Sequence, residues 1–433
     1  SLSRKLWYDL WPVYCTEYLV RHKKINIDCC KDINRNLSAG RVQTPVLGYI
    51  LLRYEQSKHP QKYGLLKYVL EIDNGLLIIE LTQDQIYKLG VEKPRELKGK
   101  KVIIKELGRK IDEVSPLPPF TTDALLSEAS ARLGLSSTRT MQIAQELFEL
   151  GFITYHRTDS TRVSDVGIAI AKQWLQEKYG EKYTEVFKPR TWGVGGAHEA
   201  IRPTKPIDAD RLRELIREGI IQPVRPLTRY HYLVYDLIFR RFIASQMVQA
   251  VIQKQVLRVY IDSLEIDVER SIGVKHYGFL EVYPLIDVLT PVKPGEYEVT
   301  YADMRRPPLA RFHDVIKWMK DVGIGRPSTY AKIIQTLIDR KYVRVTGRAK
   351  ALMPTPRAQY VYDFLTKYFK DVVSVETTRK LEELMKKVEE GIIDYQVVLK
   401  QIYDELIHKV VNVRSDAERR RTVSYTHLTL PTN

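Results

Sequence analysis

Two separated parts of the chain carry the hydrophobic and polar pattern of strands. Residues 62–112 contain KYVLEI, GLLIIEL and KKVIIKEL, with the turn signal DNG after the first, and residues 249–302 contain VIQKQVLRVYI, LEIDVERSI and EYEVTY. Polar and apolar alternation and clustered β-branched residues are typical of strands bounded by turns. A chain with two such segments around a different stretch is predicted to leave one domain, build another and return.

Apolar residues between these segments follow helical spacing. After the proline-rich segment PLPP, which excludes a helix interior, a helix is predicted from residues 121–123 to Gly134, and a second from Ser136 or Ser137 to Gly151. A strand, residues 152–155, follows at once. Helix, short turn, helix and strand in this order form the plan of a winged helix-turn-helix unit.

A weaker copy of this plan is predicted for residues 313–346, where HDVIKWMKDV, a turn with GIGRP, a helix and the strand YVRV occur in the same order. Such a duplication has two interpretations. Helix-turn-helix units are common core scaffolds, and they also present residues to nucleic acid.

Composition narrows the possible partners. The 433 residues carry 69 Lys and Arg against 53 Asp and Glu, a formal charge of +16, and include 27 Tyr. This balance favours a polyanion, nucleic acid above all, and no apolar run is long enough for a membrane span. The three cysteines show no disulfide or zinc spacing. We expect a multidomain cytoplasmic chain, cut from a longer protein, with residues 423–433 as an unrelated tail.

The densest group of polar side chains is TYHRTDSTR, residues 154–162. Turns need polar residues at only one or two places, so this group indicates a specific role. Tyr155 is a candidate nucleophile, although a free phenol with a pKa near 10 is a poor one. Arg157, two residues on, would stabilise the phenolate and hold a phosphate if the strand continues. Asp159 and Ser160 could orient this guanidinium or cap the next helix.

A second polar group follows a glycine-rich loop in GVGGAHEAIRPT, residues 193–204. His198 and Arg202, four residues apart, would share one helix face and could donate to one phosphate. The alternatives are a structural histidine and an arginine that ends a helix. Asp208 and Asp210 have the spacing of a metal site, but capping the following helix is the simpler role.

Two further segments combine arginine with small or helix-starting residues. They are LSAGRVQTP, with Arg41 and Gln43, and GRPSTY, with Arg326 and Pro327. A proline at a helix start leaves free amides and a positive dipole end, so the second segment predicts an anion site.

Taken in order, these motifs resemble the type IA DNA topoisomerases, and most closely the topoisomerase half of reverse gyrase. The resemblance extends to residue 412 and includes YDLIFRRFIASQM and ETTRKLEELMKKVEEG. It implies that Tyr155 forms a 5′-phosphotyrosine link to one DNA strand, which is resealed after another strand passes, with Arg157 and His198 assisting. It further implies a set of residues that bind single-stranded DNA: Arg41, Gln43, Asp159, Ser160, Glu199, Arg202, Arg326, Thr329, Tyr330 and Arg340.

The implied fold is multidomain α+β, a toroid with a winged-helix-like nucleophile domain and a strand-rich arch. Its expected parts are a gate-base helical domain (1–58 and 303–412), the arch (59–112 and 249–302), the nucleophile domain (113–248) and a charged end (413–433). Residues 12–35, which hold the cysteines, match nothing in the family and suggest an insertion.

The chain also departs from the family. The acidic module that binds Mg²⁺ is not in the sequence, so no metal site is expected within it, and no P-loop motif is present, so ATP would bind only through a helicase-like half. We expect a monomer with little cleavage activity of its own.

Two alternatives remain. A tyrosine recombinase also uses Tyr, Arg and His, but there the tyrosine follows the histidine and arginine. A winged-helix DNA-binding protein explains the charge but not the crowded Tyr155 segment.

Overall fold

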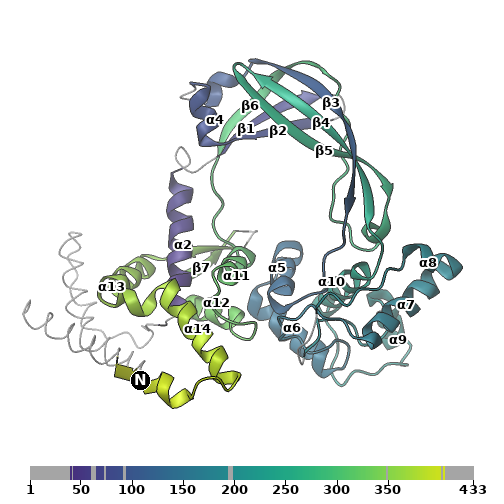
Figure 1. The fold of residues 1–433 in the computed structure, drawn as a ribbon, viewed down its shortest axis with the longest axis vertical. Coiled ribbons are helices and arrows are strands. Elements are labelled where there is room, and N and C mark those ends of the chain that lie inside the picture. The colour runs from purple at the N-terminus through teal and green to yellow at the C-terminus, as the bar shows by residue number, and fades with distance from the viewer. Residues whose placement is uncertain are drawn as a thin grey trace, which may run out of the picture. The chain divides into compact units, whose positions relative to one another are not determined.

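The computed structural model describes residues 40, 42–59, 65–72, 75–90, 94–193, 198–347, 350–400 and 403–404 (Figure 1). Arg41, the three cysteines, residues 12–35 and the tail 423–433 lie outside them. The chain divides into two compact units, one formed by residues 53–309 and one by residues 1–52 together with 310–433. Each unit is described by itself.

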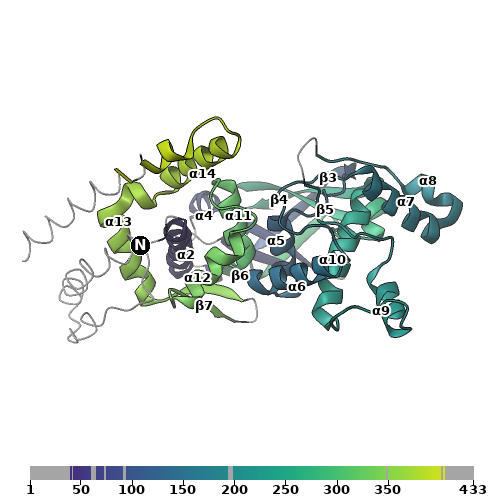
Figure 2. The ribbon, with the colours of Figure 1, turned by 90° about the horizontal axis from the view of Figure 1, so that it is seen from below.

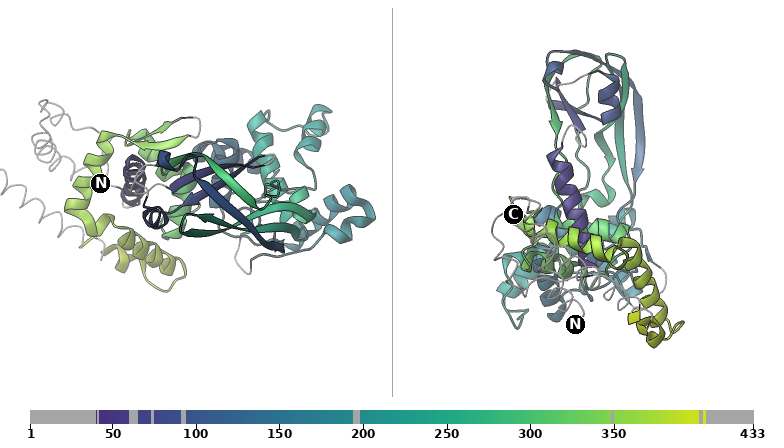
Figure 3. Two further views of the ribbon diagram at one scale, coloured as in Figure 1. Left: turned by 90° about the horizontal axis from the view of Figure 1, so that it is seen from above. Right: turned by 90° about the vertical axis from the view of Figure 1, so that its left-hand side faces the viewer.

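The first unit contains one six-stranded antiparallel sheet to which both predicted strand-rich segments contribute. Its order is β2-β1-β6-β3-β4-β5, so β6 from the second segment lies between β1 and β3 from the first (Figure 3). The strands are β1 Leu65–Ile72, β2 Gly75–Leu81, β3 Lys101–Val114, β4 Ala250–Ile261, β5 Leu264–His276 and β6 Gly295–Arg305. The predicted return of the chain is confirmed.

Alternation along these strands places one face of the sheet in a core. Val102 and Ile104 of β3 are buried together with Leu257 and Val259 of β4, while the residues between them are more exposed. The register pairs Ile104 with Val259 and shifts between Glu106 and Gly108, where a bulge interrupts β3. Burial of one face explains why polar and apolar residues alternate along these strands.

A helical part with its own core fills the stretch between the two strand segments (Figure 1). Gly134 is left-handed (φ 62°) and Ser136 accepts a hydrogen bond from the Arg139 amide, as predicted, whereas Thr121 precedes α5 without a capping bond and donates its hydroxyl to Asp123 (2.7 Å). Buried His231 of α10 lies 2.6 Å from a carboxylate oxygen of Glu146 in α6 and ties these helices together. The helices are α5 Thr122–Leu133, α6 Ser137–Glu149, α7 Asp165–Tyr179, α8 Tyr183–Val186, α9 Ala209–Arg217 and α10 Arg229–Ser245; the short α4 Gln83–Lys88 belongs to the sheet part.

The second unit contains the predicted second helix-turn-helix. Helices α11 Phe312–Asp321 and α12 Tyr330–Asp339 are followed by the hairpin of β7 Val343–Thr346 and β8 Ala351–Pro354 (Figure 2). The Tyr49 ring of α2 stacks on Trp318 of α11, with centroids 4.7 Å apart. The other helices are α2 Gln43–Lys58, of which residues 43–52 belong here, α13 Pro356–Val373 and α14 Val375–Glu389.

Candidate active site

The segment that carries Tyr155 is short and is held by a partner far away in the sequence. Gly151 adopts a left-handed conformation (φ 73°) and ends α6. The chain then pairs with residues 202–204, through bonds from the Thr154 amide to the Arg202 carbonyl (2.9 Å) and from the Thr204 amide to the Phe152 carbonyl (3.1 Å). The predicted strand 152–155 is therefore reduced to a single bridge, between Ile153 and Pro203.

Beyond this bridge, side chains alternate between solvent and interior. Tyr155, Arg157 and Asp159 are exposed, whereas His156 and Thr158 are buried. The strand does not continue past the bridge, because residues 156 and 157 form a bend, so the expected placement of Arg157 on the side of Tyr155 stays a prediction; both residues are exposed. An exposed phenol beside an exposed guanidinium can meet an anionic substrate from solvent.

Three aromatic rings surround the ring of Tyr155, whose residue is 38% exposed. Its centroid lies 5.4 Å from Phe148 and 5.6 Å from His156, both nearly edge-on, and 5.5 Å from His198. Edge-to-face contacts of this kind favour one ring orientation. The structure thus brings Tyr155 and His198 together, and Arg157 follows Tyr155 two residues along the chain.

Hydrogen bonds from the start of α5 fix the backbone after Tyr155. The Thr122 hydroxyl donates to the carbonyl of His156 (2.8 Å) and accepts from the Thr158 amide (2.9 Å). Ser160 accepts from the Arg162 amide. Ser160 does not cap α7, because Ser164 takes that position. The loop is rigidly positioned, as a site that must present one side chain requires.

His156 is a residue that sequence reasoning passed over. It is 0% exposed, and neither ring nitrogen has a hydrogen-bond partner. Burial, and then the positive charge of Arg157, lowers the pKa of His156 to about 4. The ring is therefore neutral at pH 7, and nothing in the uniformly polar sequence of residues 154–162 distinguished His156 from its neighbours.

The expected helix at residues 198–202 is wrong. These residues are extended, because Ile201 bridges Phe120 and Pro203 bridges Ile153. In this conformation His198 is exposed, while Arg202 is buried. Spacing of four residues fits a helix face, but partners distant in sequence decided the conformation.

Arg202 binds Glu199 rather than solvent. Its Nε lies 2.8 Å from Oε2 and its Nη2 lies 3.0 Å from Oε1, and Ser164 donates its hydroxyl to the same carboxylate (2.9 Å). Burial alone would raise the pKa of Glu199, but the bonds from Arg202 and Ser164 outweigh it and lower the pKa. The predicted DNA contacts of both residues stay predictions.

Trp192 fixes the course of the chain at residues 191–193. Its φ is +61°, rare for a bulky residue, and the Gly193 amide bonds to the Thr191 carbonyl (2.7 Å), which closes a tight three-residue turn. The indole N–H donates to the Ser245 carbonyl (3.1 Å). The turn and the indole hydrogen bond together hold this part of the chain against the end of α10.

The remaining predicted DNA-binding residues belong to the other unit. Gln43 is half-buried near the start of α2, Tyr330 is buried at the start of α12, and Arg340 follows its end. Helix α12 starts three residues after Pro327, so the proline does not occupy the first helical turn. The Arg326 guanidinium is held by two carboxylates, Glu382 and Glu389.

Acidic side chains of the described residues do not gather into a metal site. No group of three or more His, Cys, Asp or Glu is placed to hold an ion within these residues. Asp208 caps α9 by accepting from the Arg211 amide (2.9 Å), as the simpler interpretation predicted. None of the described helices is long and apolar enough to cross a membrane.

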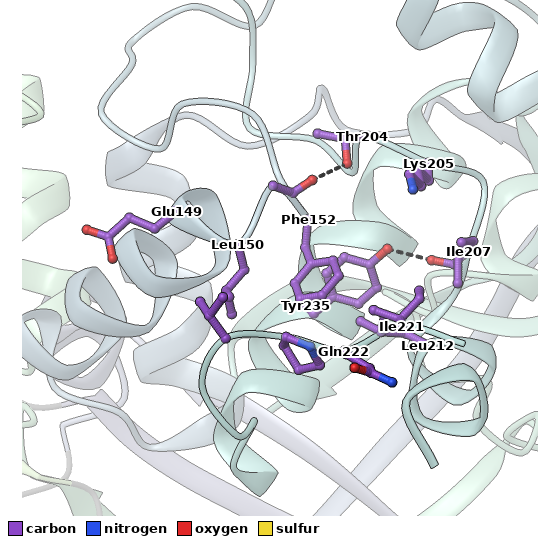
Figure 4. A pocket seen from close by; sticks show the side chains of 13 residues that line it. Glu149, Leu150, Phe152, Thr204, Lys205, Ile207, Leu212, Ile221, Gln222 and Tyr235 are labelled. Carbon is purple, nitrogen blue, oxygen red and sulfur yellow. Dashed lines mark hydrogen bonds between the residues drawn. The ribbon is translucent and has the colours of Figure 1, made fainter. Parts of the chain in front are cut away.

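A hollow of about 290 Å³ lies beside the Tyr155 segment but contains none of the predicted site residues (Figure 4). Phe152 and Tyr235 form part of its wall, and Lys205 and Glu149 lie at its edge. The Tyr235 hydroxyl donates a hydrogen bond to the Ile207 carbonyl (2.5 Å), and the Thr204 hydroxyl donates one to the Gly151 carbonyl (2.6 Å). Phe152 and Tyr155 are three residues apart, so their side chains would face opposite sides of an extended chain. This spacing is consistent with Phe152 lining the hollow while Tyr155 does not.

Comparisons with known proteins agree on one family. The sequence profile of a DNA topoisomerase family matches residues 18–400. The chain is 45% identical to the reverse gyrases of Pyrobaculum aerophilum and Pyrococcus furiosus, across 87% of this chain and 30% of each relative. It therefore spans less than a third of their length. Full-length topoisomerase I from Thermotoga maritima has a similar structure, with a TM-score of 0.65 and 27% identity, over 93% of this chain and 65% of that one.

Proposed function

Because this chain belongs to the type IA DNA topoisomerase family, we propose that it supplies the strand-cleaving tyrosine and DNA-binding surfaces of a longer topoisomerase. The observation that carries the proposal is the placement of Tyr155: an exposed phenol, oriented by three rings, beside exposed Arg157 and His198. The family assignment decides against a tyrosine recombinase.

In this proposal the Tyr155 Oη attacks a backbone phosphorus of one strand. A bond forms from the phenolic oxygen to phosphorus, the bond from phosphorus to the 3′-oxygen breaks, and the phenolic proton ends on the departing 3′-hydroxyl. Because one phosphodiester replaces another, the link keeps the energy needed for resealing, and the 3′-hydroxyl reverses the attack.

Arg157 and His198 would act on the same phosphate. The permanent charge of Arg157 stabilises the charge that develops on the phosphate oxygens, and its exposure leaves it free to approach them. His198 is exposed and its ring lies against Tyr155, so it can donate to the same group. Arg202 and Glu199 would act indirectly, because their contact fixes the segment that presents His198.

We propose further that the longer protein is a reverse gyrase, since relatives of that name match across most of the chain. ATP and Mg²⁺ would then be bound by other parts of that protein, because the sequence contains no P-loop motif and the described residues hold no cluster of metal ligands. Single-stranded or underwound DNA is the proposed substrate, consistent with the charge of +16.

The test is covalent trapping of a labelled single-stranded oligonucleotide. The chain is mixed with the acidic module of a relative and Mg²⁺, and the labelled peptide is identified by mass. We expect the label at Tyr155 and its loss in Tyr155→Phe, whereas Tyr230→Phe, which changes a somewhat more exposed tyrosine (45% against 38%), should retain it. An adduct that persists in Tyr155→Phe would refute the assignment.

A further inference from the structure

Arg326, expected to hold DNA, already has two anionic partners from another helix of its unit. Its Nε lies 2.8 Å from Glu382 Oε2, and its Nη1 lies 2.6 Å from Glu389 Oε1. Both glutamates belong to α14, more than fifty residues further along the chain. The turn that carries Arg326 is fixed as well, because its amide donates to the Thr329 hydroxyl (2.8 Å).

The two carboxylates are arranged as a pair. Glu382 and Glu389 are seven residues apart on one helix, which is about two turns, so both lie on one face of α14. They contact different nitrogens of the same guanidinium. A guanidinium binds carboxylate and phosphate oxygens through the same N–H groups, so these carboxylates occupy donors that a DNA phosphate would need.

The contact is not sealed from solvent. About a third of the Arg326 side chain is exposed, and the Glu389 side chain is 59% exposed. Partly solvated ion pairs contribute little net stability, so a competing anion can replace them at small cost. The difference from Arg202 lies in the arginine itself, since the Arg202 side chain is 6% exposed against 32% for Arg326, while Glu199 and Glu382 are both 22% exposed.

We propose that Glu382 and Glu389 act as an internal phosphate substitute that holds Arg326 until a DNA strand displaces them. This inference rests on the proposed function, because it assumes that Arg326 contacts DNA. Binding of a strand exchanges carboxylate for phosphate oxygens, and release of the strand restores the contact with α14. Because DNA must displace the two carboxylates, the exchange lowers the affinity of the chain for DNA and favours release of a resealed strand.

The test measures affinity of the chain for a fluorescent single-stranded oligonucleotide. The variant is Glu382→Gln with Glu389→Gln, and the matched control is Glu383→Gln with Glu390→Gln. The control removes the same charge from the next positions of the chain, where the partners are Arg379 (3.7 Å) and Lys386 (3.8 Å). We expect the variant to bind roughly fivefold more tightly than the control, by loss of two partly exposed pairs.

An Arg326→Ala background shows whether the gain acts through Arg326. There the two glutamine substitutions should change affinity no more than the control does. A gain that survives Arg326→Ala, or a variant equal to the control, overturns the inference while DNA binding itself stands. If none of these proteins binds single-stranded DNA, both the inference and the proposed function fail.

Stability is measured alongside, because the contact also joins α14 to the turn before α12. The single substitution Glu389→Gln leaves the Glu382 contact in place and changes a mostly exposed side chain, so it preserves the fold. It should still raise affinity, by less than the double variant. A loss of stability without any gain in affinity would show that the contact is structural only.

Discussion

Arg202 and Glu199 form a two-point contact in which both guanidinium and carboxylate are largely withdrawn from solvent, with side-chain exposures of 6% and 22%. Gly167 of α7 packs so closely on this arginine that a Cβ there would lie 2.8 Å from its Nε. The pair therefore has little room to exchange partners, and it fixes the extended segment that begins at His198.

Breaking this pair should destabilise the protein. Arg202→Ala leaves the Glu199 carboxylate half-buried without its main partner, and we expect the free energy of unfolding to fall by about 3 kcal/mol. Chemical denaturation measures the change. Arg211→Ala, which removes the exposed partner of Glu214, is the control and should cost about 0.5 kcal/mol or less. If Arg202→Ala weakened DNA binding at unchanged stability, Arg202 would be a DNA contact and not a positioning residue.

The buried imidazole of His156 predicts a loss of stability in mild acid. Its folded pKa is about 4, lowered by burial and Arg157 against a small opposing effect of Glu149, and the unfolded value is near 6.5. Between these values the unfolded chain binds a proton that the folded chain does not. The contribution of neutral His156 to the free energy of unfolding is therefore complete above pH 6.5. It falls as the pH drops towards 4, by about 3 kcal/mol in all.

Denaturation between pH 7 and 4 checks this expectation. His156→Phe should flatten the dependence, whereas His198→Gln, at an exposed position, should leave it unchanged. The depressed carboxyl pKa of Glu199 acts in a lower window, because its stabilisation is lost only as the pH falls below the unfolded value near 4.5. An identical pH profile for wild type and His156→Phe would contradict the prediction.

Gly278 occupies a position that tolerates no side chain. Its φ is +49°, and an added Cβ would overlap the Gln249 carbonyl oxygen and lie 2.7 Å from that of Val248. We expect Gly278→Ala to cost about 3 kcal/mol, since both backbone strain and a backbone clash arise. Gly134→Ala has a similar φ with nothing within 4 Å, so thermal unfolding should show only about 1 kcal/mol for it. Equal effects of the two substitutions would exclude the clash.

The sequence predicted elements whose signal is local. The strands of the sheet alternate because one face is buried, and Gly134, Ser136 and Asp208 mark helix ends through their own backbone or side-chain chemistry. The return of the chain to its first domain was predicted because both separated segments show the same strand-like pattern of polar and apolar residues. These features depend on neighbours within a few residues, which a single sequence displays.

Features set by distant partners could not be read in this way. His198 and Arg202 have helical spacing, yet Phe120 and Ile153 hold the segment extended. The acidic partners of Arg326 lie on α14, and no local pattern near the GRPSTY motif points to them. The crowded Tyr155 segment was recognised because its polar residues are themselves contiguous.

Binding of single-stranded DNA by the chain should depend steeply on salt. Each phosphate neutralised on a single strand contributes a slope of about −0.7 to log K against log salt concentration. Arg157→Ala should weaken binding and reduce the slope by less than one unit, because it removes one exposed charge beside Tyr155. Fluorescence anisotropy at several salt concentrations gives both values. Tyr155→Phe serves as the control, since a neutral hydroxyl releases no counterion, and it should leave the slope unchanged. A Tyr155→Phe variant that lost as much affinity as Arg157→Ala would make Tyr155 a platform for base stacking, and a salt-independent affinity would argue against phosphate contacts altogether.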